Sequence, residues 1–238
     1  MLGAANIYSA LTTSSFLSSV EATFVIATSA AVFSVLVGTP FAYLLARYDF
    51  KFKEIIDAVI DIPIMIPHVI VGLMIILAFA STFGFGPFLQ GIGVNMIDTL
   101  IGAVVTVTYL SATYSIRVVE SAVKMVNPDV ELTARTLGAG PTFTFIHVIV
   151  PRIWKSIANG AILTWARAVA EVGALLIVAY YVYFSGNYYY PASIYIYESF
   201  EALGLAGAIK YSAALLVIVL AIFILCRLAL GRSSTKRP

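Results

Sequence analysis

Charged residues are scarce in this sequence. Asp, Glu, Lys and Arg make up 11% of its 238 residues, whereas an ordinary soluble domain carries about 25%. Hydrophobic residues make up 61%, and the mean hydropathy is +0.98. So little charge does not cover a water-facing surface. The composition therefore indicates an integral membrane protein, and it excludes a soluble enzyme or a nucleic-acid-binding domain.

Residue types that carry catalysis or bind metals are also few. The single cysteine, Cys226, excludes a disulfide within the chain. The two histidines, His68 and His147, show no metal-ligand spacing. The sequence lacks the GxxxxGKS/T phosphate loop, the HExxH motif and any nucleophile constellation. We therefore expect no catalytic residue, no metal site and no cofactor in this chain itself.

Five apolar segments are long enough to cross a membrane, since a bilayer core of about 30 Å requires about 20 helical residues. The predicted spans are 22–46, 55–83, 99–116, 156–181 and 207–230. Their unbroken apolarity favours helices over barrel strands. The sequence thus predicts an all-α integral membrane protein with about five transmembrane helices in a domain at 22–230. An extracytoplasmic, interfacial segment at 1–21 precedes this domain, and a basic cytoplasmic tail at 231–238 follows it.

Basic residues gather in connections on one side of the predicted spans. They lie at 47–53, at 117–155 and near the C-terminus, whereas 1–21, 84–98 and 182–206 contain no Lys or Arg. The basic side of a membrane protein is usually cytoplasmic. We therefore expect the N-terminus outside and the C-terminus inside a cell membrane. Eight tyrosines between 180 and 197 are interpreted as an interfacial belt, with contact to substrate as the alternative.

The cytoplasmic connection at 117–155 is long and contains the pattern of a short helix. Asn127 suits the start of that helix, and Gly138 suits a left-handed stop at its end. Glu131 and Arg135 are four positions apart, in the order that favours an exposed ion pair.

One face of this short helix is apolar, because Val130, Ala134 and Leu137 recur at helical spacing. Either this face lies along lipid headgroups, or it docks into a groove of a cytoplasmic subunit. Composition does not decide between the two.

Several sequence segments resemble the permeases of ABC importers. ELTARTLGAGP at 131–141, followed by IVP at 149–151, resembles their cytoplasmic EAA motif, with Leu132 and Thr133 as departures. Three further segments resemble oxyanion-importer permeases, and their amino-acid sequences are most similar to those of the molybdate/tungstate type. They are GTPFAYLLAR at 38–47, DIPIMIPHVIVG at 61–72 and WARAVAEVGALLIVAYY at 165–181.

The resemblance implies a type I ABC importer permease core with a cytoplasmic coupling helix, working as a homodimer. The implied partners are two ATP-binding cassette subunits, which bind ATP and Mg, and an extracytoplasmic oxyanion-binding protein. Permeases of this type often have six spans, so the first is either absent or upstream of Met1. The predicted residues that dock on the ATP-binding subunit are Val130, Glu131, Ala134, Arg135, Leu137, Gly138, Ala139 and Pro141.

Arg167 and Glu171 are an ionisable pair deep in a predicted span, where charge is costly and marks a functional candidate. Their spacing places them on one helix face, in the less favourable order of the two charges. We therefore expect at least one of them to have another partner, in a second copy or in the pore. Either the pair locks helices or subunits together, or Arg167 attracts the passing anion.

Two prolines interrupt the second predicted span. Pro63 and Pro67 each remove a helix hydrogen bond, so we expect a kink or break that is either a pathway-lining hinge or a static bend. His68 is interpreted as a hydrogen-bonded packing residue rather than a proton carrier. Asp57 and Asp61 are interpreted as hydrated groups near the inner boundary.

The predicted function is that of the permease subunit of an ATP-driven molybdate/tungstate importer. A sulfate or thiosulfate permease is the alternative within this class, since another tetrahedral dianion would use similar parts. An ATP-independent secondary transporter is the alternative from another class. It would need a proton relay, for which Glu171 and His68 are the only basis in the spans.

Overall fold

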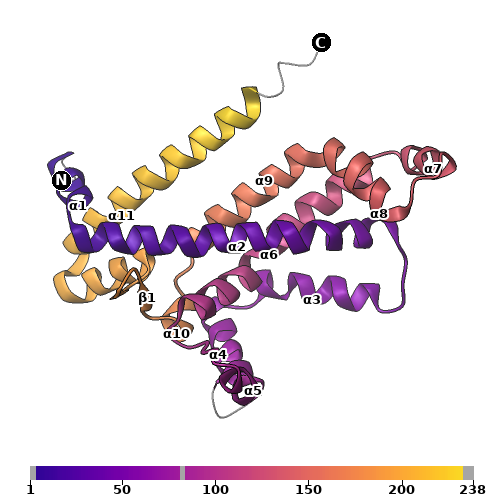
Figure 1. The fold of residues 1–238 in the computed structure, drawn as a ribbon. Coiled ribbons are helices and arrows are strands. Elements are labelled where there is room, and N and C mark those ends of the chain that lie inside the picture. Colours follow the sequence, from indigo (N-terminus) through magenta and orange to yellow (C-terminus); the bar gives the residue numbers. More distant parts are fainter. Residues whose placement is uncertain (1–3, 81–83, 233–238) are drawn as a thin grey trace.

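The computed structural model describes residues 4–80 and 84–232, and its fold is built almost entirely of helices (Figure 1). The parts of the predicted segments that fall on 1–3, 81–83 and 233–238, which include most of the predicted basic tail, lie outside the described residues. The helices are α1 (Ala4–Leu11), α2 (Ser14–Arg47), α3 (Lys53–Met65), α4 (His68–Phe79), α5 (Gly86–Gly91), α6 (Leu100–Met125), α7 (Asp129–Thr136), α8 (Pro141–Thr144), α9 (Val150–Val169), α10 (Leu175–Val178) and α11 (Ala192–Arg232), with a π-helical turn η1 (Phe145–Ile149) between α8 and α9.

The centre of the molecule is the packing of α2, α6 and α9 along one another (Figure 1). Small side chains allow the close approach, among them the fully buried Ala27, Ala30 and Ala103. A Cβ on Gly160 of α9 would lie 3.1 Å from the Cα of Ser115 in α6. In membranes, helices associate through such small-residue contacts, because lipid provides no hydrophobic driving force between them.

The helices differ from several predicted span boundaries. α2 begins at Ser14 rather than 22, and α6 continues to Met125 rather than 116. The predicted span at 156–181 is wrong in its second half, because α9 ends at Val169 and the chain continues through α10 into a hairpin. The predicted span at 207–230 lies inside α11, which is interrupted at Gly204 by a φ of 68°.

The predicted span at 55–83 is not one continuous helix in the part that the structure describes. α3 and α4 are bent by 119° relative to each other. The bend lies at Ile66 and Pro67, which have extended backbone. Pro67 lacks the N–H that a continuing helix would use, and the residue before a proline avoids helical backbone. The predicted break is therefore present, and it is far sharper than a kink.

Several of these helices are long and apolar enough to cross a membrane. Among the described residues, α2, α6 and Ala192–Leu230 of α11 have this length and apolarity, and the bent pair α3–α4 makes a fourth candidate if it counts as one span. α9 carries Arg152, Lys155 and Arg167 within its 20 residues and does not reach the same apolarity. The chain is therefore a multi-pass membrane protein, whose fourth predicted span is amphipathic rather than uniformly apolar.

A two-stranded antiparallel hairpin departs from the purely helical expectation. Strands β1 (Val182–Phe184) and β2 (Asn187–Tyr189) pair with Tyr183 opposite Tyr188. The turn residues Ser185 and Gly186 have φ values of 49° and 86°, the left-handed pair that matches the twist of a tight hairpin. The hairpin holds part of the tyrosine cluster, whose role as an interfacial belt stays a prediction.

Candidate functional site

The predicted coupling helix forms as α7, at one end of the molecule (Figure 1). Asn127 caps its first turn, accepting a hydrogen bond from the main-chain N–H of Asp129 at 3.0 Å. Gly138 follows the helix with a φ of 90°, a conformation that side-chain-bearing residues rarely adopt. Pro141 then begins α8 at the position where a proline costs no hydrogen bond. The helix–glycine–proline framework is thus present.

Glu131 fastens α7 to the end of α2. This side chain is buried, and it accepts hydrogen bonds from the hydroxyl of Tyr43 and from Nε of Arg47, both at 2.6 Å. Arg47 also donates to the main-chain oxygen of Val126 at 2.7 Å, just before α7. The ion pair between Arg47 and Glu131 is largely shielded from solvent, so removing either partner would leave the other charge buried and unpaired.

The predicted exposed pair between Glu131 and Arg135 is wrong. Glu131 faces inward to α2, and the exposed Arg135 donates instead to the hydroxyl of Tyr48 at 3.2 Å. That hydrogen bond raises the pKa of the Arg135 guanidinium above its ordinary value. The i, i+4 rule failed here because packing α7 onto α2 supplies a buried partner that an isolated helix lacks. The signal available in the sequence was Tyr43 and Arg47, four apart at the end of a long apolar run.

The opposite side of the α7–α8 turn is open. Leu137 is 84% exposed, and Leu132 and Phe143 are also exposed. A shallow hollow of about 490 Å³ lies at the turn, lined by Ala134, Leu137, Gly138, Ala139, Gly140 and Phe143. Of the residues predicted to dock, Arg135, Leu137, Gly138 and Pro141 are exposed and Val130, Ala134 and Ala139 are half-buried, whereas Glu131 is buried against its own chain.

A second candidate site lies where α9 ends. Oε2 of Glu171 is 3.1 Å from a guanidinium nitrogen of Arg167 and 2.8 Å from Nδ1 of His68. The same Arg167 nitrogen is 2.8 Å from Nε2 of His68. It also lies 2.5 Å from Nδ1, so the guanidinium contacts both ring nitrogens of His68. The pair therefore has a further partner, His68, which comes from α4 of the same chain rather than from a second copy.

Glu171 is the buried centre of this cluster. Its side chain is 1% exposed, and its Oε1 accepts from the main-chain N–H of Ala174 at 3.0 Å. Its main-chain oxygen accepts from the hydroxyl of Ser193 at 2.6 Å. Arg167 and His68 are partly exposed, at 21% and 31%. In this cluster the acidic group, Glu171, is therefore buried, whereas the two basic groups are partly exposed to solvent.

The bend at Pro67 positions His68. Because α4 starts at His68, the break places this imidazole at the beginning of a helix that packs on α10. Two glycines allow the contact: a Cβ on Gly72 would lie 3.0 Å from the main-chain oxygen of Ala174, and a Cβ on Gly173 would lie 3.2 Å from the Cβ of His68. Pro63 is buried within α3, one turn before the bend.

An ionic cluster around Arg117 was not predicted from the sequence. Arg117 donates to the carboxylates of Asp57 at 2.7 Å, Asp61 at 2.9 Å and Glu120 at 2.7 Å, and Lys124 pairs with Glu120 at 2.6 Å. The interpretation of Asp57 and Asp61 as merely hydrated groups is therefore wrong. Asp57 and Asp61 are one turn apart and so lie on one face of α3, and this was the available signal.

Arg117 is expected to hold α3 against α6. Replacing it with Gln leaves three carboxylates facing one another, so the detergent-solubilised chain should melt at lower temperature. The loss should correspond to about 1–2 kcal/mol, because the groups are partly exposed and screened by solvent. Lys124→Gln, which removes only the contact to Glu120, is the control and should change the melting temperature less. Equal melting of Arg117→Gln and the unaltered chain would contradict this role.

Comparisons with known proteins agree with these features. Residues 38–237 match the family described as binding-protein-dependent transport system inner membrane component. The molybdate/tungstate transport system permease protein WtpB of Thermococcus kodakarensis is 35% identical over 87% of this chain and 76% of its own length. The probable sulfate transport system permease protein cysT of Zygnema circumcarinatum is 26% identical over 97% of this chain and 80% of its own.

Solved structures share the fold. A bacterial ABC transporter involved in the import of alginate superposes with a TM-score of 0.73 at 18% identity, over all of this chain and 85% of the other. The MetNI methionine ABC transporter gives 0.65 at 20% identity, over 92% and 94%. The helical core around α2, α6 and α9 is thus the fold of ABC importer permeases. With the family match over most of the sequence, the chain belongs to the inner-membrane components of binding-protein-dependent transport systems.

Proposed function

We propose that this chain is the permease subunit of an ATP-driven importer of molybdate or tungstate. It would work as a homodimer with two ATP-binding cassette subunits on the cytoplasmic side and an oxyanion-binding protein outside. The proposed orientation places the N-terminus outside and the α7–α8 turn in the cytoplasm, as the distribution of basic residues favours. ATP and Mg would be bound by the partner subunits.

The observation that carries the proposal is the α7–α8 turn. It combines an exposed apolar face at Leu132, Leu137 and Phe143 with a buried anchor at Glu131. Such a face suits insertion into a groove of another protein. The anchor would transmit the partner's motion to α2, since the ion pair and the hydrogen bond to Glu131 join the two helices directly.

A mechanical path leads from α2 to the cluster at the end of α9. α2 packs on α6 and α9, and α9 carries Arg167. Arg167 and Glu171 hold His68 at the start of α4. We propose that Arg167, Glu171, Pro63 and Pro67 line or gate the anion pathway, so that movement of α9 shifts α4 about its break. The partly exposed Arg167 supplies positive charge for a passing dianion, and weak attraction suits a path that must also release its ion.

Molybdate or tungstate is the proposed substrate because four WtpB proteins match this chain at 33–36% identity, over 75–76% of their own lengths. Proteins named as sulfate permeases also match it. The CysT protein of Synechococcus elongatus, for example, is 30% identical over 85% of this chain. Sulfate is therefore the competing substrate.

Purification in mild detergent followed by reconstitution tests this function. We expect an ATPase and an extracytoplasmic binding protein to accompany the chain, and elemental analysis of proteoliposomes should detect ATP-dependent uptake of molybdenum or tungsten. Uptake of sulfur alone would identify sulfate as the substrate in place of molybdate or tungstate. Uptake that continues without ATP, from a preparation that contains no ATPase, would overturn the proposal in favour of a secondary transporter.

A further inference from the structure

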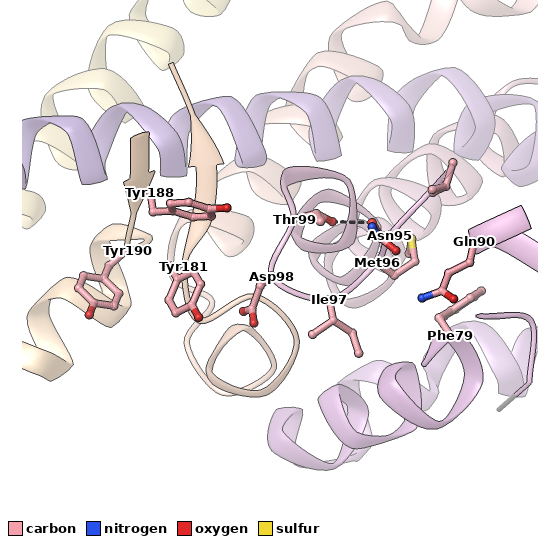
Figure 2. Close-up of a pocket in the computed structure, with 11 residues that line it drawn as sticks. Phe79, Gln90, Asn95, Met96, Ile97, Asp98, Thr99, Tyr181, Tyr188 and Tyr190 are labelled. Carbon is pink, nitrogen blue, oxygen red and sulfur yellow. Dashed lines mark hydrogen bonds between the residues drawn. The ribbon is translucent and has the colours of Figure 1, made fainter. Parts of the chain in front are cut away.

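A cavity of about 750 Å³ lies between the β-hairpin and the connection from α4 to α6, well away from α7 (Figures 1 and 2). Figure 2 shows tyrosine rings on one side of Asp98 and the amides of Asn95 and Gln90 on the other. The lining residues that matter here are Gln90, Asn95, Asp98, Tyr181, Tyr188 and Tyr190.

Asp98 is held in place by its backbone and by its carboxylate. Its main-chain N–H donates to the oxygen of Val178 at 2.9 Å, and its φ is 52°. One carboxylate oxygen accepts from the main-chain N–H of Tyr180 at 3.0 Å. Asp98 is partly buried and lines the cavity. The cavity therefore has a fixed negative charge in its wall.

Among the described residues that line the cavity, no basic residue offsets this charge, since none of them is Lys, Arg or His. The sequence contains no Lys or Arg at 54–116 or at 168–209. A dianion entering the cavity would be repelled by Asp98, whereas a cation would be attracted. The tyrosine rings add to this preference, because an aromatic face attracts a cation lying over it. The cavity suits a cation, and it does not suit the transported oxyanion.

The source of that cation is restricted. A second copy of this chain has no Lys or Arg in its outer connections, and Lys210, the next basic residue, lies over the ring of its own Tyr211 at 5.0 Å. A divalent metal ion would need several oxygen ligands, and Asp98 is the only carboxylate among the described residues that line the cavity. A Lys or Arg side chain of another protein fits the carboxylate, the tyrosine rings and the amides of this lining together.

We propose that this cavity receives a lysine or arginine side chain of the extracytoplasmic binding protein. The inference rests on the proposed function, because it requires an extracytoplasmic binding protein as the partner. Asp98 would pair with the cationic group, the tyrosines would cover its apolar stem, and Asn95 and Gln90 would accept its remaining hydrogen bonds. An arginine or lysine stem buries well against such rings.

The test uses the reconstituted transporter and its binding protein loaded with molybdate. The measured quantity is the binding-protein concentration that half-saturates stimulation of ATP hydrolysis. Asp98→Asn keeps an acceptor for Tyr180 and removes only the charge, so this concentration should rise about tenfold or more. The difference in half-saturating concentration between Asp98→Asn and the unaltered transporter should become smaller near 1 M salt, where charges are screened within about 3 Å. Glu201→Gln, which removes an exposed acid from α11, is the matched control and should not raise it.

A second pair of variants covers the case in which Asp98→Asn does not assemble. Tyr188→Leu removes an exposed aromatic face and should raise the half-saturating concentration, whereas Tyr188→Phe keeps the face and should not. A photo-crosslinker at position 188 should label a binding-protein peptide that contains Lys or Arg. An unchanged half-saturating concentration in both Asp98→Asn and Tyr188→Leu, or crosslinks only to a second copy, would overturn the inference. Absence of any stimulation in the unaltered transporter would instead overturn the proposed function.

Discussion

Replacing Glu131 with alanine is expected to uncouple ATP hydrolysis from transport. The variant removes the carboxylate that receives Arg47 and Tyr43 at 2.6 Å, and it leaves the shielded guanidinium without its ion-pair partner. Breaking a buried pair in this way costs about 3–5 kcal/mol, which weakens the attachment of α7 to α2. The amount of oxyanion imported per ATP hydrolysed in proteoliposomes should fall at least tenfold, because a cost of about 1.4 kcal/mol already corresponds to a factor of ten.

Asp129→Ala is the matched control for Glu131→Ala. Asp129 lies in the same helix and carries the same charge, but it is exposed, and its side chain accepts a hydrogen bond from the amide of Asn127. The Asp129→Ala variant should therefore retain transport that is coupled to ATP hydrolysis. Glu131→Gln should fall between the two, because the amide can still accept from Tyr43 but does not neutralise Arg47. Normal coupling in Glu131→Ala would show that α7 does not transmit motion through this anchor.

Replacing Glu171 with glutamine should reduce both the amount of assembled transporter and its flux. The amide still accepts from the N–H of Ala174, but the charge that balances Arg167 is lost from a site only 1% exposed. An unpaired charge at membrane depth costs at least about 2.5–3.5 kcal/mol. We expect at least a tenfold loss of ATP-dependent uptake, measured together with the yield of intact complex from the membrane.

The double variant Arg167→Gln with Glu171→Gln separates the two roles considered for this pair. If the pair only locks α9 to α4 through His68, the neutral double variant should recover both assembly and uptake. If Arg167 attracts the anion, the double variant should assemble and still fail to transport. Wild-type yield and wild-type uptake in Glu171→Gln alone would exclude both roles.

Local features of this chain could be predicted from the sequence. The apolar runs of α2, α6 and α11 require helices, because a backbone in lipid must satisfy its hydrogen bonds internally. Gly138 and Pro141 mark a stop and a restart through their own backbone preferences. The contact between Arg167 and Glu171 could be expected from their four-residue spacing, although α9 ends at Val169 and Glu171 follows the helix. Each of these depends on residues within about four positions of one another.

The partners of the charged groups depended on how the helices pack. Glu131 meets Tyr43 across 88 positions, Arg117 meets Asp57 across 60, and Arg167 meets His68 across 99. No periodic pattern links residues so far apart, so the exposed pair predicted for Glu131 and the hydrated state predicted for Asp57 and Asp61 were wrong. The size of the bend at Pro67 was likewise open, because a missing hydrogen bond frees the chain to turn without setting the angle.

The amino-acid order was therefore enough to establish a helical membrane protein with a structured turn between α6 and α9, since composition and short-range spacing control both. Long-range packing settled what that turn is attached to, which imidazole completes the charge cluster, and where an acidic cavity opens beside the tyrosine hairpin. The physical reason is that burial creates strong, specific electrostatic contacts only after distant helices have come together. The energies of these contacts cannot be read from the sequence of any single segment.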